Sequence, residues 1–217
     1  ATLLNGDEVA VKILRPNIIA DVAKDINLLY RLVKIFNILL KNSQRLSLTR
    51  VIAELENHLH DELDLSCEAA NASTFARKFN SEDSLIKVPK IYWHYVSKNV
   101  MVMEKVTGVP ILSINELKKQ GVDLKFLATS GLNLFFQQVF EHNFFHADMH
   151  GGNVFIDAKN PNRPSYICVD FGIMGSLSDI DKRYIAENLL AFFNQDYKKI
   201  AALHLESKWL PDSVRID

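Results

Sequence analysis

Residues 146–153 read His-Ala-Asp-Met-His-Gly-Gly-Asn, and residues 166–172 read Tyr-Ile-Cys-Val-Asp-Phe-Gly, with a short β-like run between them. In a kinase catalytic centre, one Asp faces the hydroxyl that attacks the phosphoryl group, while an Asn and a second Asp hold the metal ions that bridge the phosphates. The step from Asp148 to Asn153 matches the spacing of the kinase catalytic loop. We therefore predict Asp148 as a catalytic residue, alongside Lys12 and Glu68 discussed below, and Asn153 and Asp170 as metal ligands.

The start of the chain is typical of a β-hairpin. Asn-Gly at residues 5–6 separates the β-prone runs Thr2–Leu4 and Glu8–Leu14. The second run carries Lys12 in an apolar context, as in the kinase strand whose lysine pairs the α- and β-phosphates of ATP, and Ala10 would then cover the adenine. A lysine on an edge strand that faces water gives the same local pattern, so the kinase interpretation depends on the downstream motifs.

Two helical segments follow. Apolar residues recur every three or four positions from Ile18 to Leu40, and a second helical run covers residues 48–79, with a break predicted near Asp61. We expect a helical insertion at about residues 17–60, followed at about 62–79 by the helix that kinases call αC. In kinases a carboxylate of αC clamps the strand lysine. We assign this role to Glu68, because the small apolar residues that follow it indicate a buried environment.

Three acids lie close together in this helix, namely Glu62, Asp64 and Glu68. On one continuous helix Asp64 and Glu68 would share a face, and Glu62 would lie on another. The alternative to the clamp is a solvated acidic helix face, which is the usual fate of charge clusters.

The hinge between the two lobes is expected at the end of a strand pair. Residues 88–96 and 99–106 read as two strands joined by a tight turn at Ser97-Lys98. In this position the backbone groups of Glu104 and Val106 would hydrogen-bond adenine, and Met103 would stand behind it. Any buried strand followed by a glycine looks similar, so this assignment depends on the order of motifs along the chain.

Patterns in the second half of the sequence predict mostly helices. Residues 124–140 form a strongly apolar pattern that we interpret as core, and Ser178 and Asp179 are good N-cap residues for a further helix. A last helix from about Asp196 would fray at Pro211. No Ala-Pro-Glu follows Asp-Phe-Gly, and Ala147 stands where kinases carry the Arg that grips an activation-loop phosphate. The usual platform for a peptide substrate therefore cannot be assembled.

Three histidines, His142, His146 and His150, are spaced four apart, which invites a zinc interpretation. We reject it, because Gly-Gly at 151–152 breaks a helix at once and no Glu follows His146 as in His-Glu-x-x-His. His146 is expected instead to brace the catalytic loop near the Asp-Phe-Gly turn.

The composition sets further limits. The chain has 217 residues, 48% of them hydrophobic, and a net charge of −1, so no global charge argues for a nucleic-acid partner. No apolar run approaches the length of a membrane span. Because Ala1 is not preceded by a methionine, we expect a piece of a longer protein.

The predicted fold class is α+β, a two-lobed protein-kinase-like fold. Its N-lobe would cover residues 1–106 and consist of a small mixed sheet with inserted helices. Its C-lobe would cover residues 107–217 and be mainly helical.

His-Ala-Asp in place of the usual His-Arg-Asp, together with Glu68-Ala-Ala-Asn and residues 183–188, closely resembles the UbiB family of atypical, protein-kinase-like proteins. That family has a Glu-x-Asp motif, matched by Glu62 and Asp64, and its salt-bridge Glu matches Glu68. The resemblance implies ATP and Mg²⁺ as cofactors and an ATPase or unorthodox kinase that supports ubiquinone biosynthesis. It implies quinone-biosynthesis enzymes or lipid precursors as partners. It also implies membrane association, through segments absent from this chain, at the cytoplasmic side of the inner membrane, while this fragment itself is expected to be soluble.

There are departures from the family pattern and two alternatives. The family's Lys-x-Gly-Gln motif and Ala-rich nucleotide loop should precede Ala1, and Gly151 stands where the family loop typically has Pro. One alternative is a small-molecule phosphotransferase of the aminoglycoside or choline kinase type, which also pairs a His-x-Asp loop with no Ala-Pro-Glu. The other is a non-catalytic nucleotide-binding scaffold.

Overall fold

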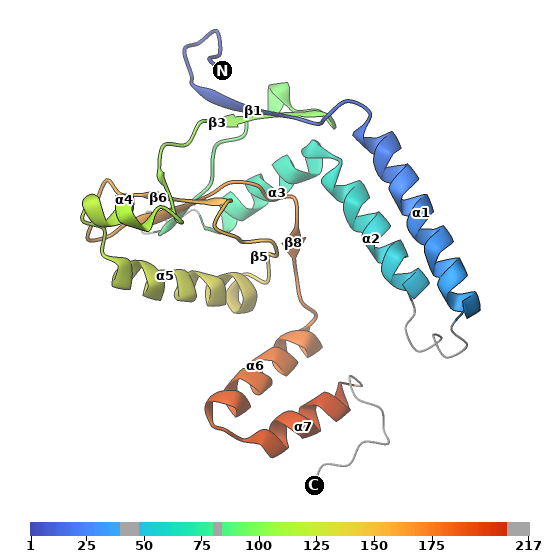
Figure 1. The fold of residues 1–217 in the computed structure, drawn as a ribbon. Coiled ribbons are helices and arrows are strands. Elements are labelled where there is room, and N and C mark those ends of the chain that lie inside the picture. Colours follow the sequence, from blue (N-terminus) through green and yellow to red (C-terminus); the bar gives the residue numbers. More distant parts are fainter. Residues whose placement is uncertain (40–47, 80–83, 208–217) are drawn as a thin grey trace. The chain divides into compact units, whose positions relative to one another are not determined.

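The structure is a computed structural model that describes residues 1–39, 48–79 and 84–207 (Figure 1). The chain forms two compact units, one of residues 1–134 with 146–174, and one of residues 135–145 with 175–217. The predicted lobe boundary at residues 106/107 falls inside the first unit and stays a prediction. The expected helix end at Leu40 and the fraying at Pro211 lie outside the described residues.

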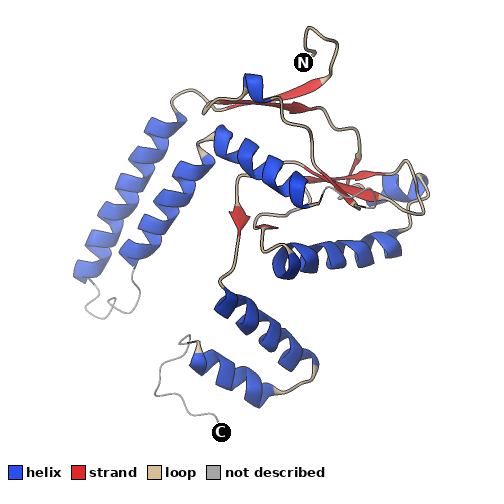
Figure 2. Ribbon diagram, turned by 180° about the vertical axis from the view of Figure 1, so that it is seen from behind, coloured by secondary structure: helices blue, strands red, loops and turns tan. Residues whose placement is uncertain are grey.

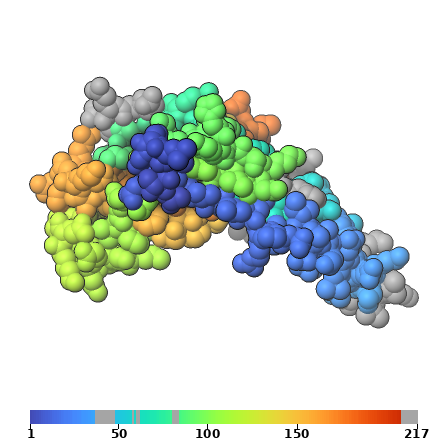
Figure 3. Space-filling model, turned by 90° about the horizontal axis from the view of Figure 1, so that it is seen from above, coloured from blue at the N-terminus to red at the C-terminus, as the bar shows by residue number. Residues whose placement is uncertain are grey.

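The first unit begins with an antiparallel strand pair. Strand β1 (Val9–Ile13) pairs with β3 (Val100–Glu104), and the register sets Ala10 opposite Met103 and Lys12 opposite Met101. Directly opposed residues share a face of the ribbon, so Ala10 and Lys12 lie on the face of the buried Met101. The predicted hairpin before β1 is present as a turn with one bridge, between Thr2 and Glu8. In the space-filling view the dark blue N-terminal residues lie against the green segment that includes β3 (Figure 3).

The insertion between β1 and the αC position consists of two helices that lie side by side. They are α1 (Ile18–Leu39) and α2 (Leu48–Glu62), seen from both sides in Figures 1 and 2. The next helix, α3 (Leu65–Lys78), corresponds to the predicted αC. The break therefore comes at residues 63–64, slightly later than the predicted position near Asp61.

Asp64 does not belong to the body of a helix. It is the N-cap of α3, with extended backbone angles and a side chain that accepts a hydrogen bond from the Ser66 N–H. The expectation that Asp64 and Glu68 share one helix face is therefore wrong, because a capping Asp satisfies the first free N–H groups of the helix and stops it from continuing backwards.

Helix α3 packs on the strand pair and forms the core of this region. Leu65, Ala69 and Met101 make one buried cluster, and Met103 packs against its edge. The Leu65 N–H also donates to the Lys98 carbonyl at 2.9 Å, which ties the start of α3 to the turn before β3. This packing fixes which side of α3 faces Lys12.

A four-stranded mixed sheet carries the second half of the unit. Its order is β2 (Ile86–Lys87), β7 (Ser165–Cys168), β6 (Val154–Asp157) and β4 (Val109–Pro110), with β2 and β7 parallel and the other pairs antiparallel. Ile156 and Cys168 are almost fully buried in this sheet. Burial raises the pKa of the Cys168 thiol to about 12, so this cysteine is an inert core residue.

The predicted strand over residues 88–96 is largely wrong. Only Ile91 bridges to β3, opposite Met103, and the 3₁₀-helix η2 (Trp93–Tyr95) follows it. Pro89 has no N–H to donate to a ladder, and a 3₁₀ turn cannot pair with a strand. The expected turn also moves by one residue, because Ser97 and Val100 exchange backbone hydrogen bonds around residues 98–99.

Helices cover the remaining sequence. The short α4 (Ile114–Lys119) precedes α5 (Leu124–Phe136), which continues as the π-helical segment η3 (Gln137–Glu141), so the predicted helix over 124–140 is confirmed with a widened last turn. The Tyr166 hydroxyl of β7 donates to the Leu127 carbonyl, which docks α5 on the sheet. The prediction that the apolar residues of this helix all belong to the core is wrong in part, because Leu132 is 57% exposed.

The second unit holds α6 (Asp179–Phe193) and α7 (Tyr197–Glu206), which form a helical hairpin (Figure 1). Ser178 caps α6 as predicted, since its hydroxyl accepts from the Asp181 N–H. The two-residue strands β5 (Phe145–His146) and β8 (Met174–Gly175) pair with each other. In the described part of the chain, none of the helices has both the length and the apolar character that crossing a bilayer requires.

Candidate active site

An ion pair links β1 to α3. The Lys12 ammonium lies 2.8 Å from both carboxylate oxygens of Glu68. Glu68 is 4% exposed, whereas the Lys12 side chain is 36% exposed. The pair forms because Lys12 and the buried Met101 share one face of the strand pair, and α3 packs on Met101 through Ala69. The two residues that the sequence assigns to the nucleotide-phosphate clamp therefore meet.

Burial and charge act in opposite directions on this pair. Burial raises the pKa of the Glu68 carboxyl, and the nearby Lys12 ammonium only partly offsets that effect. At Lys12, burial works toward a lower pKa, but the hydrogen bond and negative charge of Glu68 outweigh it, so the pKa of Lys12 is raised. The lysine is therefore held firmly in its charged form, as a phosphate-binding group must be.

Asp170 joins the pair from the end of β7. Its Oδ2 lies 3.2 Å from the Lys12 ammonium, and its Oδ1 accepts the Gly172 N–H at 3.2 Å. The backbone of Asp170 is in the left-handed region, at φ 71°, a conformation in which Asp and Asn are the most frequent residues after glycine. This turn of the chain directs the carboxylate back toward Lys12.

The catalytic loop places Asn153 next to this group. The Asn153 N–H donates to the His150 carbonyl, and the Asn153 carbonyl accepts the Val169 N–H, both at 2.9 Å. Because Val169 immediately precedes Asp170, this backbone hydrogen bond brings the chain at Asn153 close to the chain at Asp170. The Asn153 amide also donates to the Asp148 carbonyl at 3.5 Å, which leaves its amide oxygen available as an acceptor.

Asp148 lies at the open side of the loop. Its side chain is 56% exposed, with Oδ2 3.8 Å from His150 Nε2, and its N–H donates to His146 Nδ1 at 3.2 Å. An exposed carboxylate held by its own backbone can reach a hydroxyl or water that approaches from solvent. His146 itself is buried, and its ring packs 5.6 Å from that of Phe171. Burial lowers the pKa of His146, so the ring is neutral at pH 7.

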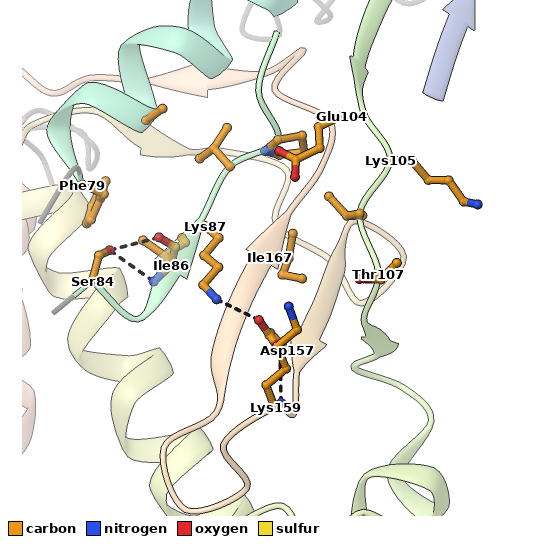
Figure 4. Close-up of a pocket in the computed structure, with 14 residues that line it drawn as sticks. Phe79, Ser84, Ile86, Lys87, Glu104, Lys105, Thr107, Asp157, Lys159 and Ile167 are labelled. Atoms are coloured by element: carbon orange, nitrogen blue, oxygen red, sulfur yellow. Dashed lines mark hydrogen bonds and ion pairs between the residues drawn. The ribbon is translucent and has the colours of Figure 1, made fainter. Parts of the chain in front are cut away.

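The residues assigned to adenine fall into two groups. Ala10 and Met103 oppose each other on the strand pair, on the same face as Lys12. Glu104 and Val106 belong instead to the wall of a cavity of about 480 Å³, which also includes the ion pair of Lys87 and Asp157, 2.7 Å apart (Figure 4). None of Lys12, Glu68, Asp148, Asn153 or Asp170 belongs to that wall. The structure therefore brings the phosphate-side residues together, and the hinge residues border a separate hollow.

The two residues of the Glu-x-Asp motif lie at the junction of α2 and α3. Glu62 is the exposed last residue of α2. Asp64 caps α3 and hydrogen-bonds the Ser66 N–H at 3.0 Å as well as the Ser66 hydroxyl, and the latter bond is the main reason why the pKa of Asp64 is lowered. Asp64 therefore acts as the N-cap of α3.

Sequence reasoning gave no role to one residue of the site, although that residue ends the Glu68-Ala-Ala-Asn run. The Asn71 side chain donates to the Phe171 carbonyl at 2.9 Å, inside the Asp-Phe-Gly turn. Asn71 follows Glu68 by three residues, which places both on the same face of α3. That spacing was the signal that could have identified it.

Comparisons with known proteins agree with this geometry. The ABC1 atypical kinase-like domain family matches residues 1–204. A Marinobacter nauticus protein named "Probable protein kinase UbiB" is 46% identical over 217 residues, which is 100% of this chain and 40% of that protein. The chain thus spans about two-fifths of that relative's length.

A solved structure shares the fold. It is the Mycobacterium tuberculosis protein Rv3197 in complex with erythromycin, with a TM-score of 0.72 and 21% identity over 99% of this chain and 52% of that one. At this identity the likeness shows the fold alone, and it confirms the predicted kinase-like α+β class. The chain belongs to the ABC1 atypical kinase-like family, and the resemblance to UbiB proteins predicted from its sequence is confirmed.

Proposed function

We propose that this chain binds ATP with Mg²⁺ and acts as an atypical kinase or ATPase that supports ubiquinone biosynthesis. The observation that carries the proposal is the convergence of three residues from distant parts of the sequence. The Lys12 ammonium is 2.8 Å from Glu68 and 3.2 Å from Asp170, and the Asn153 carbonyl accepts the N–H of Val169, the residue before Asp170. Packing alone does not require three charged side chains at one place.

The available donor atoms suit Mg²⁺. This ion prefers carboxylate and other oxygen ligands, and it keeps several waters while sharing phosphate oxygens. The Asp170 carboxylate is 42% exposed, and the Asn153 amide nitrogen faces the Asp148 carbonyl, so its oxygen faces away from that bond. Each Asp170 oxygen already accepts one hydrogen bond, from Lys12 or from the Gly172 N–H, and keeps a second lone pair for a metal ion, while the Asn153 amide oxygen can serve as a further ligand. Thiolates and imidazoles, which would select softer metals, do not belong to this pair.

Each residue then has a defined task. ATP and Mg²⁺, when bound, would supply the transferable phosphoryl group and the positive charge that stabilises its transfer. Lys12 holds the nucleotide phosphates, and Glu68 keeps the lysine ammonium in place. Asn153 and Asp170 hold the metal, and Asp148 accepts a hydrogen bond from the attacking hydroxyl or water and orients it. Neutral His146 supports Asp148 by accepting its N–H.

The role in quinone metabolism is supported by the relationship to the UbiB protein, which is 46% identical to this chain. The corresponding partners of the intact protein are quinone-biosynthesis enzymes or lipid precursors. The corresponding location is the cytoplasmic side of the inner membrane. Ala147 and the absence of Ala-Pro-Glu after Gly172 in the sequence favour an acceptor other than a peptide.

The first test is Mg²⁺-dependent ATP turnover by the intact protein, with phenolic precursors and lipid added. Asp148→Asn should lower turnover by a factor of about 100 or more, the usual contribution of a positioned acid–base residue, while ATP binding persists. Asp179→Asn, which changes a fully exposed aspartate of α6 in the same way, is the matched control. Equal turnover by wild type and Asp148→Asn would favour the non-catalytic scaffold instead.

The second test separates ubiquinone biosynthesis from a small-molecule phosphotransferase. Cells whose only copy of the intact protein carries Lys12→Ala should lose ubiquinone and accumulate a precursor. Normal ubiquinone in cells that express the variant at wild-type level would contradict the biosynthetic role, even if ATP turnover is confirmed.

A further inference from the structure

One face of α3 contacts the middle residue of the Asp-Phe-Gly turn at three points. Glu68, Asn71 and Phe75 follow each other at intervals of three and four residues, so they lie in one line along the helix. Each of them contacts a different part of Phe171. The mechanism proposed above uses only Glu68, which leaves the other two contacts to be explained.

The contacts cover the backbone and the ring of Phe171. Its N–H donates to Glu68 Oε1 at 3.4 Å, and its carbonyl accepts the Asn71 amide at 2.9 Å. The ring lies 5.3 Å from that of Phe75 and 5.6 Å from that of His146. Phe171 is 2% exposed, so its backbone groups are cut off from water and depend on these partners.

The two hydrogen bonds fix two peptide planes. The Phe171 N–H belongs to the peptide that follows Asp170, and the Phe171 carbonyl belongs to the peptide that precedes Gly172. Asp170 has φ 71°, outside the main region for residues with a side chain, so its conformation needs support from its surroundings. The Gly172 N–H in turn donates to Asp170 Oδ1. A chain of contacts therefore runs from Asn71 through the 171–172 peptide to the Asp170 carboxylate.

We propose that Asn71 is a positioning residue that holds the 171–172 peptide and thereby keeps the Asp170 carboxylate in its metal-binding orientation. This inference rests on the proposed function of Asp170 as a Mg²⁺ ligand. Removal of the amide leaves a buried carbonyl without its donor, and the turn then populates other backbone conformations. Metal affinity falls in proportion to the population of the competent conformation.

The chain offers a matched set of variants. Asn71→Leu keeps the size of the side chain and removes the donor. Asn71→His restores a ring N–H at the branch position that the asparagine amide nitrogen occupies. Ala70→Leu introduces the same leucine one position away, on the exposed side of α3, and serves as the control.

The experiment measures the Mg²⁺ concentration for half-maximal ATP turnover by the intact protein. Asn71→Leu should raise it roughly tenfold, the scale of one net hydrogen bond, with the maximal rate at saturating Mg²⁺ changed much less. Asn71→His should recover most of the loss, and Ala70→Leu should match the wild type. An unchanged Mg²⁺ requirement in Asn71→Leu, or an equal loss in Asn71→His, would overturn the proposal, because packing alone would then explain the residue.

A second readout does not depend on turnover. Hydrogen exchange of the peptide covering residues 169–173 should be faster in Asn71→Leu than in Ala70→Leu, because the Gly172 N–H loses its fixed orientation. Unchanged exchange contradicts the positioning role directly. If the wild-type protein shows no Mg²⁺ dependence at all, the proposed function fails, and the exchange result still decides whether Asn71 holds the turn.

Discussion

The Lys12 ammonium contacts both carboxylate oxygens of Glu68 at 2.8 Å, across 56 residues of sequence and the whole α1–α2 insertion. Only the lysine side of this pair reaches solvent, because Glu68 is almost fully buried. A buried carboxylate whose one strong partner is half-exposed makes the region sensitive to changes at position 12.

Lys12→Met should destabilise the fold more at pH 8 than at pH 5. Burial already raises the pKa of Glu68 above the ordinary 4.5, and the loss of Lys12 raises it further. When the pKa of a carboxyl is higher in the folded protein than in the unfolded chain, the free energy of unfolding falls as pH rises from the unfolded-state pKa through the folded-state pKa. The reason is that the unfolded chain releases the proton more easily over this range. We expect a loss of about 1–3 kcal/mol at pH 8 in urea unfolding, the usual cost of a buried polar group left without its partner, and a smaller loss toward pH 5.

The control for this prediction is Lys12→Met combined with Glu68→Gln. The double variant has no buried carboxylate at position 68, so its stability relative to the wild type should depend much less on pH. A single variant whose deficit is the same at both pH values would show that Glu68 is not the group responsible.

His146 should make stability fall on mild acidification. Burial lowers the pKa of His146 below its ordinary 6.5, so the unfolded chain takes up a proton at a pH where the folded chain does not. The unfolding free energy contributed by this residue therefore declines as pH drops below about 6.5. His146→Asn keeps an acceptor for the Asp148 N–H and removes the titration. Its midpoint of thermal unfolding should fall less between pH 7 and pH 5.5 than that of the wild type, and parallel curves would contradict this assignment.

Asp64 should behave as a helix cap. Asp64→Ala is expected to cost about 1 kcal/mol in unfolding free energy, whereas Asp64→Asn and Asp64→Ser should cost much less, because each retains an acceptor for the Ser66 N–H. Equilibrium denaturation of the three variants provides the measurement. If Asp64→Asn is stable and yet loses ATP turnover, the Glu-x-Asp motif has a role in addition to capping.

Gly131 should not tolerate a side chain. A Cβ at this position of α5 would overlap the Tyr166 hydroxyl and come within 3.0 Å of its Cζ. Gly131→Ala normally gains about 1 kcal/mol in a helix, but overpacking a buried contact costs about 1–3 kcal/mol, so we expect net destabilisation. Tyr166→Phe removes the overlapping oxygen. The double variant should therefore be more stable than the sum of the two single effects, and strict additivity in thermal unfolding would argue against the contact.

Much of the fold followed from local patterns in the sequence. Alternation of apolar residues around Lys12 and the cap at Ser178 placed β1 and α6 correctly. The motifs around Asp148 and Asp170 indicated a kinase-like centre because an Asp, an Asn and an Asp-Phe-Gly run occur there in a fixed order and spacing. Each of these features depends on residues that lie close together in the sequence.

The errors arose where tertiary context decides. Residues 88–96 are apolar enough for a strand, yet Pro89 and the 3₁₀ turn at Trp93–Tyr95 leave only one bridge to β3. Asn71 was seen only as part of the Glu68-Ala-Ala-Asn run and was given no role, because an asparagine in a helix has many uses and its partner is 100 residues away. The position of Glu104 and Val106 beside a separate cavity also could not be read from the sequence, because it depends on how the sheet and α3 enclose space.

The most direct test of the central claim is calorimetric titration of the intact protein with ATP, in the presence and absence of Mg²⁺. We predict that the wild type binds ATP much more tightly with Mg²⁺, that Asp170→Asn abolishes the effect of the metal, and that Lys12→Ala weakens binding under both conditions. Binding of ATP by Asp170→Asn that is as tight and as Mg²⁺-dependent as in the wild type would contradict the assignment of this group of residues to a nucleotide and its metal.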